Sequence, residues 1–384
     1  MRSHSLMVLA FLVSVAGADT VRAQSPPVLG SWAVVASPNG GTGVEGNLLL
    51  ATVAISSTDV WAVGAAPNRS SFLTATLAEH WDGTEWSIVE TPPIDLPFVR
   101  LNSIAAVGSR DVWAAGYAEN PSCICAETVI EHWDGSSWIR VSSPNPGVAN
   151  FLYGITAVSP TDIWAVGYQW PTQSSWVPLL LHYDGTSWTQ FDQSQLEYAR
   201  LSSVFALASN DVWAVGWIGR GAGIEALALH WDGTSWTSMP FPTEPGGWIG
   251  LNSVSGVAAN DAWAVGTYSY YNINGQVERR ARSYHWDGVS WTNVVVGLGG
   301  YSYLTNVAAI ATDDVWAVGA GYVGYDPTYR YVTLHWDGIS WSSVANPNQG
   351  ILYAVSASSR SDVWAVGYDF ATTRGTHSIH YTEP

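Results

Sequence analysis

The chain has 384 residues and carries 31 acidic against 14 basic residues, which gives a formal net charge of −17. Every basic residue is an arginine, and lysine does not occur. Nucleic-acid binders need a basic surface that displaces counterions from phosphates, and an anionic membrane surface would repel this chain. The composition therefore argues against nucleic-acid and membrane partners.

The first residues have the pattern of a secretory signal. Arg2 precedes an apolar stretch that ends at Ala16, and Val21-Arg22-Ala23 is a small-residue cleavage pattern before Gln24. Ala16-Gly17-Ala18 offers a second cleavage site. We predict a signal peptide over residues 1–23 and one mature domain over 24–384, secreted or periplasmic.

Self-similarity dominates the mature chain. The run Asp59-Val60-Trp61-Ala62-Val63-Gly64 recurs with small variations, which makes seven copies, and a second run from His80 to Trp86 occurs six times. A fixed period of about 50 residues is typical of solenoids and propellers. The further copies of the first run begin at Asp111, Asp162, Asp211, Asp261, Asp314 and Asp362, and those of the second at His132, His182, His230, His285 and His335.

The missing seventh copy of the second run is divided between the two ends of the chain. The last repeat stops after His380-Tyr381, and Gly30 to Val35 resembles the remaining part, with Trp32 at the closing-Trp position. Pairing these segments would cover edges that an open array exposes. We therefore predict a ring closed by the N-terminal strand.

Each repeat has the pattern of four short strands. In the second repeat these are expected over 101–107, 112–116 and 128–133 and from Trp138 onward. Asp134-Gly135 between two strand patterns is a strong hairpin signal. The sequence thus predicts an all-β, seven-bladed β-propeller of four-stranded antiparallel blades.

Asp-Val-Trp-Ala-Val-Gly followed by His-Trp-Asp-Gly-Thr-Ser-Trp resembles the repeat of bacterial exported β-propeller proteins of the kelch-like type, similar to the central domain of galactose oxidase. The resemblance covers essentially the whole mature chain and implies the fold. The kelch Gly-Gly doublet is not regular here, and nothing near Cys123 or Cys125 matches the Tyr-Cys cofactor of a copper-radical oxidase. The resemblance therefore implies no activity.

The repeated polar residues are interpreted as structural. Equivalent His side chains on adjacent blades are separated by roughly 10 Å, too far to share one metal ion. We expect each His and the Asp two residues on to hydrogen-bond within and between strands, and each Asp of Asp-Val-Trp to accept turn N–H groups. We predict no metal, no cofactor and no catalytic residue. Cys123 and Cys125 leave two alternatives open, a local disulfide or free thiols.

Four of the 23 tryptophans fall outside the repeat positions. We expect them in the second-to-third-strand connections and in the link between blades four and five, partly exposed on one face, where binding residues usually lie. The predicted ligand-binding residues are Trp170, Trp176, Trp217 and Trp248.

Exposed aromatic side chains give a glycan or protein site contact area at low entropic cost. Two hypotheses follow for a monomeric protein. The first is an exported, lectin-like recognition module for a glycan, and the second is a scaffold that engages a protein ligand. A glycan hydrolase or lyase is a weaker third alternative.

Overall fold

The computed structural model consists of strands joined by turns and loops. Its described residues contain 28 strands, and none of them forms a helix that could cross a membrane. The predicted signal peptide lies outside the described residues. The structure describes residues 30–38, 47–67, 74–221, 223–322, 329–346, 349–370 and 375–382.

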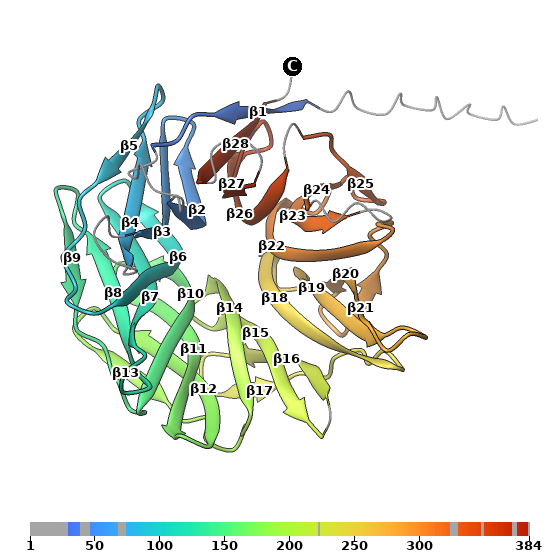
Figure 1. Cartoon of the computed structure of the whole chain (residues 1–384), viewed down its shortest axis with the longest axis horizontal. Helices are drawn as coiled ribbons and strands as arrows, with labels where there is room; N and C mark the ends of the chain where they lie inside the picture. Colours follow the sequence, from blue (N-terminus) through green and yellow to red (C-terminus); the bar gives the residue numbers. More distant parts are fainter. Residues whose placement is uncertain are drawn as a thin grey trace, which may run out of the picture.

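Each repeat forms an antiparallel set of four strands, and the sets are arranged radially around a central opening (Figure 1). The first strand of each repeat lies innermost and pairs with the second. The first strands are β2 (Leu48–Ser56), β6 (Phe98–Gly108), β10 (Ala149–Ser159), β14 (Ala199–Ala208), β18 (Gly247–Ala258), β22 (Tyr301–Ala311) and β26 (Gly350–Ser359). The second strands are β3 (Asp59–Pro67), β7 (Asp111–Asn120), β11 (Asp162–Thr172), β15 (Asp211–Arg220), β19 (Asp261–Tyr271), β23 (Asp314–Tyr322) and β27 (Asp362–Asp369).

The third and fourth strands complete each set toward the outside of the ring. The third strands are β4 (Thr74–Trp81), β8 (Cys125–Trp133), β12 (Ser175–Tyr183), β16 (Gly223–Trp231), β20 (Val277–Trp286), β24 (Arg330–Trp336) and β28 (Thr376–Thr382). The fourth strands are β5 (Trp86–Val89), β9 (Trp138–Val141), β13 (Trp188–Phe191), β17 (Trp236–Ser238), β21 (Trp291–Val294), β25 (Trp341–Ser343) and, from the other end of the chain, β1 (Ser31–Val35).

Backbone pairing groups these strands into five four-stranded sheets and one eight-stranded sheet within the described residues. The sequence predicts seven separate sheets, so the sheet count differs. The eight-stranded sheet arises because β8 and β10 meet through one parallel pair, Ala126 with Ala149. Beside this pair, Asn150 Nδ2 donates a hydrogen bond to the Ala126 carbonyl oxygen at 3.2 Å. The two sets of strands are therefore joined by backbone pairing at one residue pair only.

The predicted pairing of the two chain ends is confirmed. Strand β1 runs antiparallel to β28, with Trp32 opposite Tyr381 (Figure 1). Trp32 is buried, and its ring centroid lies 5.4 Å from that of Trp316 and 5.6 Å from that of Tyr381. The N-terminal strand thus supplies both a sheet edge and a core residue to the last repeat.

Tryptophan packing joins neighbouring repeats. The ring of Trp61 lies 4.9 Å from Trp133 and 5.4 Å from Trp138 of the next repeat. The last repeat meets the first in the same way, because Trp364 lies 5.5 Å from Trp86. Buried aromatic pairs of this kind stabilise beyond their buried area. The repeated Trp positions therefore form the core between repeats.

A β-bulge in every first strand determines what faces the ring centre. In β6, Leu101 pairs with Gly116 and Ser103 with Ala115, so Asn102 is an extra residue. A Cβ atom on Gly116 would lie 1.9 Å from a backbone oxygen of β6, which explains the Gly that ends Asp-Val-Trp-Ala-Val-Gly. The extra residues of the seven repeats are Leu50, Asn102, Tyr153, Ser202, Asn252, Thr305 and Tyr353.

Candidate functional site

The two faces of the ring differ in their connections. In an antiparallel set of four strands, the first and third turns share one end of the strands, and the second connection and the link to the next repeat share the other. In the second repeat, residues 109–110 and 134–137 lie at the first end, which we call the tight-turn face. Residues 121–124 and 142–148 lie at the opposite end, which we call the long-connection face.

Seven His–Asp pairs lie at the tight-turn face. His80 Nε2 lies 2.8 Å from Asp59 Oδ1, and the other six pairs have distances between 2.6 and 2.9 Å. His80 therefore bonds between strands, to Asp59 of β3. The turn N–H groups expected at Asp59 are instead accepted by Asp82, which takes hydrogen bonds from the backbone N–H groups of Thr84 and Glu85. The register is the reason, since it places Trp61 opposite His80 and brings Asp59 alongside the imidazole.

The His side chains also pack on the repeat tryptophans. The His132 ring stacks on Trp113 with a centroid distance of 4.2 Å. No group of three His, Cys, Asp or Glu side chains is placed to hold a metal ion within the described residues.

The four tryptophans outside the repeat positions lie in strands, so their predicted place in connections is wrong. Trp170 belongs to β11, Trp176 to β12, Trp217 to β15 and Trp248 to β18. The physical reason is that the second strand continues for several residues beyond the Gly of the motif, and its partners lengthen with it. All four side chains are partly exposed and belong to the half of each strand nearer the long-connection face.

Two of these tryptophans form Trp–Tyr pairs. Trp176 lies edge-on to Tyr198 at 5.2 Å, and the backbone N–H of Tyr198 donates to the Trp176 carbonyl oxygen at 2.7 Å. Trp248 lies edge-on to Tyr271 at 5.3 Å, and 62% of Tyr271 is exposed. Trp248 also lines a cavity of about 370 Å³ between the fourth and fifth repeats. We call these two pairs the rim pairs.

The other two tryptophans contact side chains of first strands. Trp170 contacts Phe151 at 6.2 Å, and Phe151 stacks on Tyr168 at 4.7 Å. Trp217 lies beneath the guanidinium of Arg200, 5.0 Å from its ring centroid. The structure therefore divides the predicted set into two halves with different neighbours, and no ring pair joins two of the four within the described part of the chain.

A central channel passes between the first strands of the repeats. Its volume is about 720 Å³, and the first strands of all seven repeats line it. The seven bulge residues are all part of the lining. Arg100 and Arg200 are its charged side chains, and no Asp or Glu lines it among the residues described.

Arginine and tyrosine side chains gather where the channel meets the long-connection face. The Arg100 guanidinium lies 4.7 Å from the Tyr117 ring centroid, and that of Arg200 lies 5.3 Å from Tyr153. The Tyr117 and Tyr153 rings are 6.1 Å apart, which links the two arginines through aromatic contacts. We call Arg100, Tyr153, Arg200, Tyr303 and Tyr353 the channel mouth; all five line the channel.

The channel mouth is rich in hydrogen-bond donors. The Nε atoms of Arg100 and Arg200 are buried without a hydrogen-bond partner, and neither guanidinium forms an ion pair within the described ranges. Burial raises the pKa of the Tyr303 and Tyr353 hydroxyls above the usual range, so both stay protonated and able to donate. The arrangement favours an anionic, hydrogen-bonding ligand.

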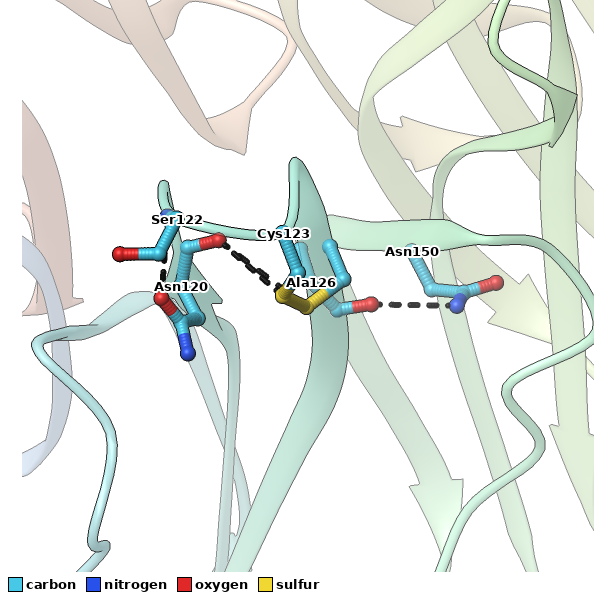
Figure 2. The surroundings of a disulfide bond; sticks show 6 residues. Asn120, Ser122, Cys123, Ala126 and Asn150 are labelled. Atoms are coloured by element: carbon cyan, nitrogen blue, oxygen red, sulfur yellow. Dashed lines mark hydrogen bonds between the residues drawn. A yellow bond between two sulfur atoms is a disulfide. The ribbon is translucent and has the colours of Figure 1, made fainter.

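Cys123 and Cys125 form a disulfide at the tip of the second-to-third connection of the second repeat (Figure 2). Ile124 between them has a φ of 52° and is exposed. Asn120 Oδ1 accepts a hydrogen bond from the Ser122 N–H at 3.0 Å and shapes the same turn. Of the two alternatives that the sequence leaves open, the structure contains the disulfide.

Two buried carboxylates were not predicted. Glu79 and Glu131 are fully buried on third strands, at a position that is Leu181 in the third repeat and Leu229 in the fourth. Burial raises the pKa of each carboxyl to about 7. For Glu79, a 2.6 Å hydrogen bond from the Ser37 hydroxyl opposes this rise.

A signal for the channel residues is present in the sequence. A Leu precedes the motif Asp by ten residues in every repeat, and the bulge residue follows that Leu. Side chains at the bulge position differ from repeat to repeat within this otherwise constant frame, from Leu50 to Asn102 to Tyr153. Positions that vary while the surrounding repeat stays constant are positions at which the repeat fold does not require one particular side chain.

Comparison with known proteins shows similarity of fold without similarity of sequence. No family model matches the chain, and a search of curated proteins gives no significant match. The architecture is that of a β-propeller, and solved propeller structures align with it over most of its length.

Three such structures illustrate the range. YCF48 bound to D1 peptide is 15% identical with a TM-score of 0.59, covering 94% of this chain and 100% of its own. An α-L-arabinanase from Penicillium chrysogenum, complexed with arabinobiose, is 13% identical with a TM-score of 0.51 over 76% and 96%. An ulvan lyase is 10% identical with a TM-score of 0.56 over 90% and 94%. At these identities the likeness shows the β-propeller fold alone.

Proposed function

We propose that this chain is an exported recognition module that binds a glycan on its long-connection face. One observation carries the proposal: Trp176 and Trp248, which the repeat does not require, are partly exposed on that face and each is held edge-on by a Tyr. Aromatic faces fixed in this way pack against the C–H faces of sugars at little entropic cost. The arabinanase complexed with arabinobiose supports the proposal in one respect, since it is a propeller with a bound saccharide.

We also infer that the ring has seven blades of the kelch-like type. The eight-stranded sheet counts as two blades because one residue pair, Ala126 with Ala149, joins its halves. The Trp contacts between repeats support the same count, since Trp61 and Trp364 pack alike on their next neighbours. The kelch-like assignment rests on the repeat motif.

A glycan array of neutral and acidic saccharides, probed with the purified full-length protein, tests the function. For a saccharide that binds, Trp176→Ala and Trp248→Ala should each weaken binding by about 2 kcal/mol, roughly thirtyfold, as aromatic hot spots do. The melting temperature should stay nearly unchanged, because both rings are partly exposed. Ile339→Ala, an exposed apolar side chain on the tight-turn face, is the matched control and should bind as the parent does.

No binding to any saccharide would contradict the proposal. So would Trp176→Ala and Trp248→Ala variants that melt several degrees lower yet bind as the parent does, because the rings would then only cover their neighbours.

A protein-interaction scaffold is the second candidate. The observation that favours it is a patch of exposed apolar residues where β19 meets β20, formed by Tyr271, Ile273 and Val277. Contiguous exposed apolar side chains often mark protein contacts. Peptide binding by a structural neighbour, YCF48 bound to D1 peptide, is compatible with this candidate.

A further inference from the structure

We propose that the channel mouth binds the carboxylate of an acidic saccharide, with Arg100 and Arg200 as its charged partners. The inference rests on the proposed glycan-binding function and adds to it the ligand class and a second site. The rim pairs are separate from this site, because neither Trp176 nor Trp248 lines the channel.

Charge placement is the first argument. The chain has a net charge of −17, yet the channel lining holds two arginines and no carboxylate among the described residues. Glu119 is near enough to Tyr117 to influence its hydroxyl, but it forms no ion pair with either arginine in the described part of the chain. Partly buried guanidinium groups without a counter-charge are costly unless a ligand supplies one.

The geometry of the arginines is the second argument. Stacking on Tyr117 holds Arg100, and stacking on Tyr153 and Trp217 holds Arg200, so both guanidinium groups are oriented before a ligand arrives. Side chains fixed in advance lose less entropy on binding. A planar guanidinium matches a carboxylate through two parallel hydrogen bonds. The repeat does not require either arginine, because Phe151 occupies the same strand position in the third repeat.

The remaining lining favours a sugar over a peptide. Tyr153, Tyr303 and Tyr353 offer ring faces for C–H groups and hydroxyls for hydrogen bonds. A channel of about 720 Å³ has the size of small-molecule sites.

A peptide would gain by pairing with a free strand edge. Backbone carbonyls of the first strands are already used between repeats, since Asn102 donates to the Leu152 oxygen at 2.7 Å and Asn252 to the Leu304 oxygen at 2.6 Å. The channel walls therefore offer little for strand addition, and a uronic-acid oligosaccharide is the ligand class that fits.

Isothermal titration calorimetry of the full-length protein tests the inference, with tetragalacturonate as the probe and its fully methyl-esterified form as the neutral match. We expect tetragalacturonate to bind and the ester to bind at least tenfold more weakly, with affinity falling as NaCl rises from 50 to 200 mM. Arg100→Gln and Arg200→Gln should each reduce affinity at least tenfold. Arg200→Lys should lose less than Arg200→Gln because the charge is kept.

Arg140→Gln is the control, because Arg140 lies on an outer strand, paired with Glu127, and its loss removes the same charge. It should leave binding unchanged. Melting temperatures of all variants show which of them fold. If a Gln variant does not fold, Arg200→Lys tests the site in its place.

Equal binding of acid and ester, or parent-like affinity of both Gln variants, would overturn the inference and leave glycan binding intact. The same holds if only neutral saccharides bind and Trp176→Ala abolishes their binding. Absence of binding by every saccharide would defeat the proposed function and this inference together. Arginine-dependent binding of a peptide through its free C-terminal carboxylate, with tetragalacturonate inactive, would assign the channel to peptides and overturn the uronate class.

Discussion

Glu131 gives the sharpest test of how the ring is packed. Its side chain is 0% exposed, and both carboxylate oxygens lack a hydrogen bond of ordinary geometry within the described residues. The nearby Thr76 hydroxyl and Arg140 favour the charged form, but burial outweighs them and raises the pKa from 4.5 to about 7. The carboxyl is therefore protonated in the folded protein at a pH where it is ionised in the unfolded chain.

The sign of the pH dependence follows from proton counts. Between pH 4.5 and about 7 the folded state binds the Glu131 proton and the unfolded state has released it. The free energy of unfolding contributed by this residue is thus complete below pH 4.5 and is lost as the pH rises through about 7. A rise of this size corresponds to roughly 3 kcal/mol.

Urea denaturation at pH 5, 6, 7 and 8 measures the effect as the difference between each variant and the parent. Glu131→Gln cannot ionise and should remove the Glu131 part of the slope. Glu131→Leu introduces the side chain that the third repeat has at the equivalent position, Leu181. This variant should raise the free energy of unfolding at pH 8 by about 3 kcal/mol, with little change at pH 5. The corresponding rise in melting temperature is a few degrees.

Matched controls separate this residue from others that titrate. Glu127→Gln, on the same strand with 42% of its side chain exposed, should leave the slope unchanged. The pKa of Glu79 is also raised to about 7, so Glu79 should still contribute to the pH dependence of the free energy of unfolding in the Glu131 variants. Burial lowers the pKa of His377 and gives a slope of opposite sign, so only variant-minus-parent differences are decisive. Parallel pH curves for the parent and Glu131→Gln would refute the reasoning.

Two further predictions concern the fold. Deleting residues 24–37 removes β1 and leaves an edge of β28 unpaired, so the variant should aggregate or melt without cooperativity in scanning calorimetry; cooperative melting like that of residues 24–384 would contradict ring closure. Replacing His132 by Ala leaves Asp111 without its partner 2.8 Å away and should lower the free energy of unfolding by about 1 to 3 kcal/mol, with metal content at background; stoichiometric zinc or copper lost on substitution would contradict a structural role.

Local signals in the sequence determined the repeat and its closure. Asp-Gly turns, apolar alternation and the run from Asp59 to Gly64 are set by residues close in the chain, and they predicted the strands and the pairing of Gly30 to Val35 with His380. The repeat frame also held a signal for Glu79 and Glu131, since the third and fourth repeats have Leu181 and Leu229 at that position. The predicted strands ended too early, because pairing beyond Gly116 depends on the partner strands.

Only the tertiary structure decided what faces the channel. Alternation along a strand normally predicts which side chains face inward and which face outward. A bulge inserts Tyr153 and its equivalents as extra residues, so beyond the bulge the two-residue period no longer predicts which way a side chain faces. Arg100 and Arg200 are a hundred residues apart in the chain and line one channel because the first strands of successive repeats converge on one centre. That convergence arises from packing between repeats, which no stretch of local sequence encodes.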